Sequence, residues 1–255
     1  IVNIANGHTV TVTANAAATS VTFTGANATI SVNAGITLIV SNTLTLNSLV
    51  NTSSTSIISG LGTITTANVI VGSDIASTSN GIYTSSINSS ISGFNVTNNI
   101  NLLSYVGTNN NRINNAVFNL QSGIVDVDGQ ITTINEHSSN TSTFTMANGA
   151  QTGTLLLGNA NPFNLSNTIT NIINLNGTGS TVRYDRSGNQ TVYPTTYNGL
   201  IILGSGTKTA SGSFTVSKDF SIQGGTFVLN NNTSYSLTIL GNYNQTGGVF
   251  DFNAG

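Results

Sequence analysis

Near its C-terminus the chain reads Phe214-Thr215-Val216-Ser217-Lys218-Asp219-Phe220 and then Gly224-Gly225-Thr226-Phe227-Val228-Leu229-Asn230. The pattern returns as Leu237-Thr238-Ile239-Leu240-Gly241-Asn242-Tyr243 and then Gly247-Gly248-Val249-Phe250-Asp251-Phe252-Asn253. The Thr, the Gly-Gly pair, the Phe that follows it and the final Asn recur in register. Short β-type runs with a period in the low twenties are typical of a solenoid, in which each repeat is one rung that packs on its neighbours.

Apolar and polar residues alternate in short runs elsewhere in the chain, as they do in half-buried strands. Examples are Val10-Thr11-Val12-Thr13, Ile36-Thr37-Leu38-Ile39-Val40, Ile124-Val125-Asp126-Val127 and Leu200-Ile201-Ile202-Leu203. Asn-Gly, Asn-Ala-Gly and Gly-Gly sequences separate such runs, and these residues tolerate the positive φ angles of tight corners. No segment shows helical periodicity. The sequence therefore predicts an all-β fold.

The period of the repeat selects among the all-β architectures. It is too short for a propeller blade of about 40 residues, but it fits one turn of a parallel β-helix. We therefore expect a single-stranded, right-handed parallel β-helix with rungs of roughly 20–25 residues. About eleven rungs at about 4.8 Å each would form a rod of roughly 50 Å. Asn side chains stacked at the corners are expected to form hydrogen-bonded ladders.

The whole chain, residues 1–255, is predicted to form one β-solenoid domain. Its repeats are clearest in residues 180–255, whereas the Ser- and Asn-rich residues 74–115 are expected to form irregular rungs and loops. The chain begins at Ile1 and ends in mid-pattern at Asn253-Ala254-Gly255. We therefore expect a fragment of a longer chain, whose neighbouring domains would be its partners.

Charged residues are unusually few. Lys and Arg number 5 and Asp and Glu number 7, which is 5% of the chain, against about 25% in typical domains. Phosphate binding needs clustered Lys and Arg, so we expect no nucleic-acid partner. The chain has no stretch of about 18 apolar residues, so we expect no insertion into a membrane. The chain has no Cys, which excludes disulfides, a thiolate nucleophile and Cys-ligated zinc. We expect no cofactor.

Two further parts of the chain carry strand-and-turn patterns. The first is Val2-Asn3-Ile4-Ala5-Asn6-Gly7-His8-Thr9-Val10-Thr11-Val12. The second runs from Ser180-Thr181-Val182-Arg183-Tyr184 through Gly188-Asn189-Gln190-Thr191-Val192 and Tyr197-Asn198-Gly199-Leu200 to Gly204-Ser205-Gly206-Thr207-Lys208-Thr209. Both resemble repeat regions of large cell-surface proteins of the Bacteroidetes type. The resemblance implies export by the type IX secretion route and an extracellular or cell-surface location. It also implies a place among adhesins that act in attachment and gliding motility.

Two short stretches carry carboxylates that could support chemistry. Asp126-Val127-Asp128-Gly129 resembles the start of a calcium loop, but the later oxygen ligands of such a loop are missing. We therefore favour a solvent-facing position for Asp126 and Asp128 and predict no metal site. Glu136-His137 could supply an acid and a base, although a solvated loop pair is the simpler interpretation.

The densest group of charges is Arg183-Tyr184-Asp185-Arg186. Arg183, Tyr184 and Arg186 are candidate ligand-binding residues, because an Arg-Tyr surface could stack on a sugar ring or accept a carboxylate. The simpler interpretation is a turn with a local ion pair, and the sequence leaves the ligand unknown.

Three functions remain open from the sequence. The repeat, the few ionisable groups and the resemblance favour a non-enzymatic extracellular structural or adhesive module, a stiff β-helical rod or stalk of a bacterial cell-surface adhesin-like protein. An alternative is a carbohydrate-binding or polysaccharide-degrading β-helix, with a sugar platform made by Tyr184, Tyr193, Tyr197, Tyr235 and Tyr243. A further alternative is an ice-binding or self-assembling filament module. Ice binding would require Thr at the same position on each rung, and the Thr-x-Thr runs do not clearly recur in register.

Overall fold

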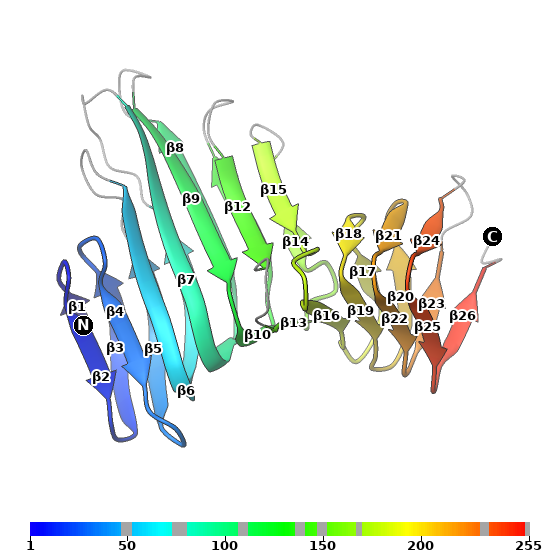
Figure 1. Cartoon of the computed structure of the whole chain (residues 1–255), viewed down its shortest axis with the longest axis horizontal. Coiled ribbons are helices and arrows are strands. Elements are labelled where there is room, and N and C mark those ends of the chain that lie inside the picture. Colours follow the sequence, from blue (N-terminus) through cyan, green and yellow to red (C-terminus); the bar gives the residue numbers. More distant parts are fainter. Residues whose placement is uncertain are drawn as a thin grey trace.

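The computed structural model shows a parallel β-helix whose strands are stacked along one long axis (Figure 1). It describes residues 1–46, 53–72, 81–106, 112–135, 141–146, 152–166, 170–229 and 235–252. The described strands form three stacks, which we call faces A, B and C. The chain visits them in the order C, A, B in each rung, and the two termini lie at opposite ends of the stack (Figure 1).

Face A is an unbroken series of parallel pairs from one end of the molecule to the other. Its strands are β3 (Ala16–Phe23), β5 (Thr37–Leu46), β6 (Ser54–Val71), β7 (Gly81–Val96), β10 (Gly123–Val127), β13 (Gly153–Leu157), β16 (Thr181–Tyr184), β19 (Gly199–Ile202), β22 (Asp219–Ile222) and β25 (Asn242–Gln245).

Face B combines the ends of β3, β5 and β6 with strands of its own. These are β1 (Val2–Ile4), β8 (Ile100–Val106), β11 (Ile131–Asn135), β14 (Phe163–Asn164), β17 (Gln190–Val192), β20 (Thr207–Ala210), β23 (Thr226–Val228) and β26 (Val249–Asp251). The amide of Thr191 donates to the carbonyl of Ala160 at 2.8 Å and so joins β17 to the rung below it.

Face C combines the beginnings of β6 and β7 with the remaining strands. These are β2 (Thr9–Val12), β4 (Thr29–Val32), β9 (Arg112–Leu120), β12 (Thr141–Met146), β15 (Thr170–Asn174), β18 (Thr196–Tyr197), β21 (Phe214–Val216) and β24 (Leu237–Ile239). Among the strand pairs of the described residues, β8 with β9 is the antiparallel one, and it lies within the stretch expected to be irregular.

The register of the last two rungs confirms the sequence repeat. Phe214 pairs with Leu237 on face C, Phe220 with Tyr243 on face A and Phe227 with Phe250 on face B. Each pair has the offset of the repeat, 23 positions, which also separates the hydrogen-bonded side chains of Asp219 and Asn242. The repeat in the sequence is therefore one rung of the solenoid.

The predicted rung length, in the low twenties, is wrong for the middle of the chain. There Ile100 pairs with Ile131. The offset is 31 positions, the same as between the hydrogen-bonded side chains of Asn88 and Asn119. Where Val182 pairs with Leu200, the offset shortens to 18 positions. The middle rungs are longer mainly on face C, where β9 has nine residues against three in β21.

The core is a column of inward side chains along the axis of the solenoid. Alternate residues are buried in the strands between the two terminal rungs, and equivalent residues stack from rung to rung because the strands are parallel and in register. The rings of Phe118 and Phe144, which pair on face C, form such a stack with a centroid separation of 5.4 Å, and Phe94 of face A packs against Phe118 across the core at 6.3 Å. The register therefore places like side chains above one another.

Amide side chains form ladders between rungs, as predicted. The Asn119 Nδ2 group donates to Asn88 Oδ1 at 2.7 Å. Asn68 Oδ1 accepts from the backbone amide of Asn99, and Asn99 Oδ1 accepts from that of Gln130. These bonds satisfy corner amides that the strand ladders leave unpaired. Among the described residues no helix is long and apolar enough to cross a membrane.

Candidate functional site

Tyr184 is fully buried in the core, so this candidate residue cannot stack on a sugar at the surface. On β16 the side chains of Val182 and Tyr184 point inward and that of Arg183 points outward. The Tyr184 hydroxyl is 2.8 Å from that of Tyr197, which is also fully buried. Burial raises the pKa of both hydroxyls well above the ordinary value of 10. Tyr197 is therefore also excluded from the predicted sugar platform.

The register brings Asp126 and Arg183 onto the outer surface of face A, two rungs apart and separated by Leu156. Asp128 and Asp185 follow the ends of the same two strands, with Gly158 at the matching position between them. The Arg183 Nη2 atom lies 3.9 Å from Asp185 Oδ2. Asp126, Asp128, Asp185 and Arg183 therefore form one cluster, which we call the face-A acidic cluster.

Electrostatics within this cluster disfavour ionised carboxylates. The pKa of Asp126 is raised, first by partial burial and then by the negative charges of Asp128 and Asp185. The pKa of Asp185 is raised by burial, against the opposing effect of Arg183. Asp185 was not predicted as a neighbour of Asp126, because residues so far apart in the sequence become neighbours only through the stacking of intervening rungs.

No group of three or more Asp, Glu or His side chains among the described residues could hold a metal ion. Glu136 and His137, the predicted acid and base, lie outside the described residues, and their pairing stays a prediction. The described residues of the cluster provide two carboxylates with raised pKa values, Asp126 and Asp185, near the guanidinium group of Arg183.

Two cations serve backbone carbonyls instead of an external ligand. The Arg186 Nη1 group donates to the carbonyl of Gly158 at 3.2 Å. Lys208 is fully buried, and its ammonium group donates to the carbonyls of Arg186, Gly188 and Ser205 at 2.7, 2.7 and 2.9 Å. Lys208 is buried because it occupies an inward position in the alternating strand β20, between Thr207 and Thr209. The sequence alone does not indicate this, because a lysine is expected at the surface.

A groove on face B combines two aromatic rings with uncharged polar side chains. Asn161, Phe163, Thr191 and Tyr193 line a hollow of about 130 Å³. Asn161, Thr191 and Thr209 also line an adjoining hollow of about 370 Å³. We call the two together the face-B groove. Tyr193 was a candidate from the sequence but Phe163 was not, because only the stacking of successive rungs makes them neighbours.

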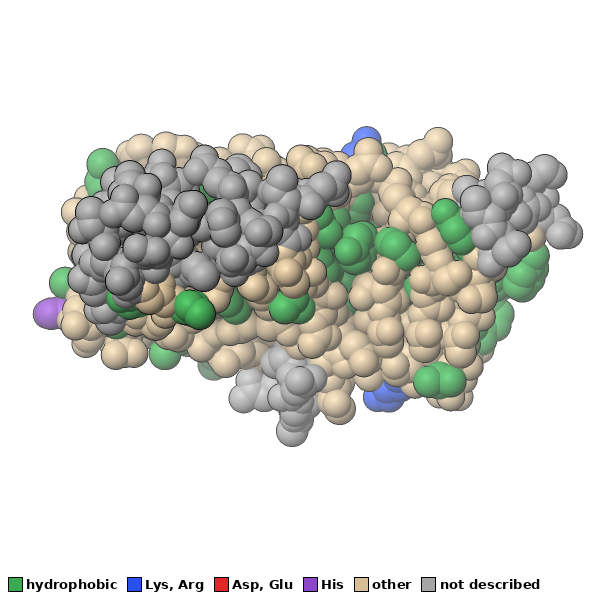
Figure 2. All heavy atoms as spheres, turned by 90° about the horizontal axis from the view of Figure 1, so that it is seen from above, with side chains coloured by type: hydrophobic (Ala, Val, Ile, Leu, Met, Phe, Trp, Pro, Cys, Tyr) green, Lys and Arg blue, Asp and Glu red, His purple; other side chains and the backbone are tan. Residues whose placement is uncertain are grey.

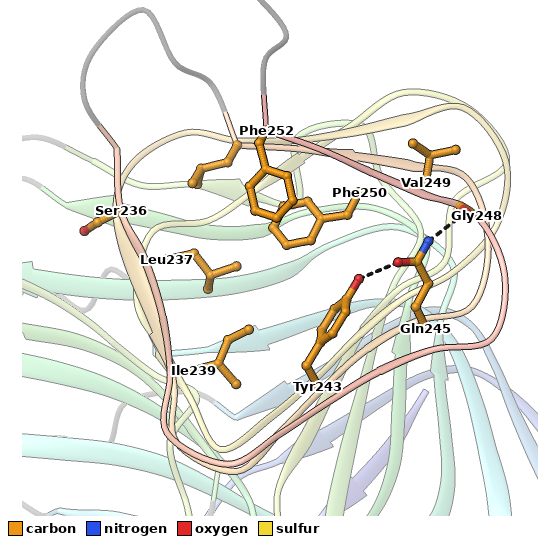
Figure 3. Close-up of a pocket in the computed structure, with 10 residues that line it drawn as sticks. Ser236, Leu237, Ile239, Tyr243, Gln245, Gly248, Val249, Phe250 and Phe252 are labelled. Carbon is orange, nitrogen blue, oxygen red and sulfur yellow. Dashed lines mark hydrogen bonds between the residues drawn. The ribbon is translucent and has the colours of Figure 1, made fainter.

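A hollow of about 770 Å³ at the last rung is apolar (Figure 3). In the close-up, the side chains of Leu237, Ile239 and Phe250 point toward its centre. Leu237 and Phe250 stand in register with Phe214 and Phe227 of the buried core one rung earlier. Because it continues the core column, we assign this hollow to packing between rungs.

Threonine hydroxyls form only short columns on the outer surface. Thr196, Thr215 and Thr238 stand in register on three successive rungs of face C. Thr207 pairs with Thr226 on face B, but Val249 follows on the next rung. No Thr column among the paired, described strands is longer than three rungs. A flat hydroxyl array for ice is therefore not built over the length of the rod.

Comparison with known proteins gives no relative. No family model matches the chain, and neither a curated protein nor a solved structure matches it. The function must therefore be argued from the surfaces described above.

Proposed function

We propose that the protein is a non-enzymatic structural and adhesive module, a stiff β-helical rod of an extracellular, cell-surface adhesin-like protein. The observation that carries the proposal is the continuity of face A, whose parallel pairs run from β3 to β25 around one filled core. Such a repeat array is stabilised by contacts between neighbouring rungs along its whole length.

The surface chemistry also supports this role. Hydroxyl, amide and backbone atoms cover most of the described surface in Figure 2, and Lys and Arg side chains show only at its edges. An uncharged polar surface on a rigid support suits contact with other uncharged polar surfaces, such as glycans, better than contact with polyanions.

Hydrogen exchange tests the rod directly. We expect slow exchange of the strand amides on face A from β5 to β22, because each of these strands pairs with a neighbour on both sides. A block of fast exchange across the strands of the middle rungs would contradict a continuous rod. The absence of catalysis is tested separately by incubation with a broad panel of polysaccharides and measurement of chain length.

Polysaccharide cleavage is the second candidate function, and the face-A acidic cluster is the observation that favours it. Carboxylates with raised pKa values are suited to general acid catalysis. If cleavage occurs, the double substitution Asp126→Asn and Asp185→Asn should abolish it. We expect no cleavage by the parent protein. If the parent protein cleaves a polysaccharide and the double variant does not, the non-enzymatic proposal is wrong.

A further inference from the structure

The face-B groove presents two partly exposed aromatic rings on neighbouring rungs. Phe163 belongs to β14 and Tyr193 directly follows β17, and their ring centroids are 4.8 Å apart with an interplanar angle of 43°. Both rings also pack against the core from outside. Two tilted rings form a shallow apolar wall, which is the kind of surface on which the C–H face of a sugar packs.

The buried tyrosine pair holds Tyr193 in place. The backbone amide of Tyr193 donates to the Tyr184 hydroxyl at 3.0 Å, and its carbonyl accepts from the Tyr197 hydroxyl. Pro194 follows and fixes its own φ angle. Because the backbone on both sides of the ring is restrained, a ligand that packs on Tyr193 loses little free energy in ordering it.

Polar groups without charge line the rest of the groove. The Thr191 hydroxyl donates to Asn161 Oδ1 at 2.8 Å. This bond orients the Asn161 amide so that its Nδ2 group points away from Thr191. Neither Asn161 Nδ2 nor Thr209 Oγ1 makes a hydrogen bond to another residue that the structure describes. Both can therefore bond to the hydroxyl groups of a ligand.

We propose that the face-B groove binds a neutral saccharide, with one sugar ring against Phe163 and Tyr193 and its hydroxyls bonded to Asn161 and Thr209. An apolar wall with a few oriented polar groups is the usual composition of a small-ligand site. The two rings line the hollow of about 130 Å³, which holds the apolar face of one sugar ring, and Thr209 lines the adjoining hollow of about 370 Å³, into which the sugar hydroxyls extend. No Lys, Arg, Asp or Glu is among the described residues that line either hollow, so nothing there would pair with an acidic sugar. This inference deepens the adhesive part of the proposed function and rests on it.

The test measures binding of the whole chain to a panel of immobilised neutral and acidic glycans, followed by calorimetric titration with the best soluble neutral oligosaccharide. Tyr193→Leu keeps an apolar side chain against the core but removes the ring, and it should weaken binding about tenfold or more. Thr209→Val removes one hydroxyl and keeps the shape of the side chain, and it should weaken binding roughly two- to fivefold.

Two control variants remove the same groups elsewhere. Tyr243→Leu removes an exposed ring at the last rung, and Thr215→Val removes a hydroxyl on face C; both should bind like the parent protein. Binding of neutral glycans that is weakened only by the groove variants supports the inference. Neutral binding that both groove variants leave unchanged overturns it, as does retention of acidic glycans alone or of none. In each of those cases the proposal of a continuous rod is unaffected, because hydrogen exchange tests it separately.

Discussion

Substitution of Lys208 by methionine should lower the free energy of unfolding by about 3 kcal/mol, because it removes a buried charge that three carbonyls share. Methionine keeps an apolar stem of similar length, so the change is confined to the three hydrogen bonds from the ammonium group. The carbonyls of Arg186, Gly188 and Ser205 would then lose that donor inside the solenoid.

The magnitude follows from two opposing effects. A hydrogen bond from a charged donor contributes about 1.5–3 kcal/mol, so three contribute roughly 4.5–9 kcal/mol. Burial of an ammonium group costs several kcal/mol, and methionine does not incur that cost. Burial also lowers the pKa of Lys208, because removal of the charged ammonium group from water favours its neutral form. The difference between the two effects leaves a net loss of about 3 kcal/mol.

Urea unfolding followed by far-ultraviolet circular dichroism and tyrosine fluorescence measures this loss. With a denaturant slope of about 3 kcal/mol per molar urea, the midpoint should fall by about 1 M. The matched control is Lys218→Met at the other lysine, which is exposed and should change stability by less than about 0.5 kcal/mol. A Lys208→Met midpoint equal to or above that of the parent protein would refute the reasoning, since the ammonium group would then destabilise the fold.

Three further predictions concern backbone conformation, the tyrosine pair and pH. Gly123→Ala should destabilise the chain at least twice as much as Gly35→Ala in the same titration. Both glycines have positive φ angles, 81° and 72°, which cost alanine about 1–2 kcal/mol, but only at Gly123 would the added Cβ collide with backbone of the preceding rung. Tyr197→Phe should cost about 1–2 kcal/mol through loss of its buried hydroxyl bonds, and an unchanged midpoint would contradict this. Burial raises the pKa values of Asp126 and Asp185 above 3.8, so the folded protein keeps protons that the unfolded chain has released. Their contribution to stability is present below about pH 4 and is lost as pH rises through the raised pKa values. The melting temperature should therefore fall less between about pH 3.5 and 7 in the double Asn variant than in the parent protein, and equal pH profiles would argue against the shifts.

The sequence alone was sufficient to predict the strand register wherever successive rungs have the same length. The constant offset near the C-terminus predicted the pairing of Phe214 with Leu237 and of Phe227 with Phe250, because identical spacing of strands and corners produces the same register. In the middle of the chain the offset rises to 31 positions and strands such as β7 run round a corner without a break, so the repeat of the last rungs does not extend there.

The sites were harder to predict because each depends on residues from different rungs. Asp126 meets Asp185, and Phe163 meets Tyr193, only after the register is known. Tyr184 was misplaced for a different reason. Its charged neighbours suggested a surface, whereas the period-2 alternation of its own strand placed it inside.

The hydrogen bonds between rungs lie nearly parallel to the axis of the solenoid, so they would bear any tension applied between its two ends. Such a molecule would lengthen by peeling one rung at a time. At about 3.3–3.6 Å per extended residue, release of the short rung between Val182 and Leu200, with its offset of 18, adds roughly 60 Å of contour length. Release of a long rung such as that between Ile100 and Ile131, with an offset of 31, adds roughly 105 Å. Unequal rungs would thus give the pulled rod extension steps of unequal length, and each step would dissipate energy.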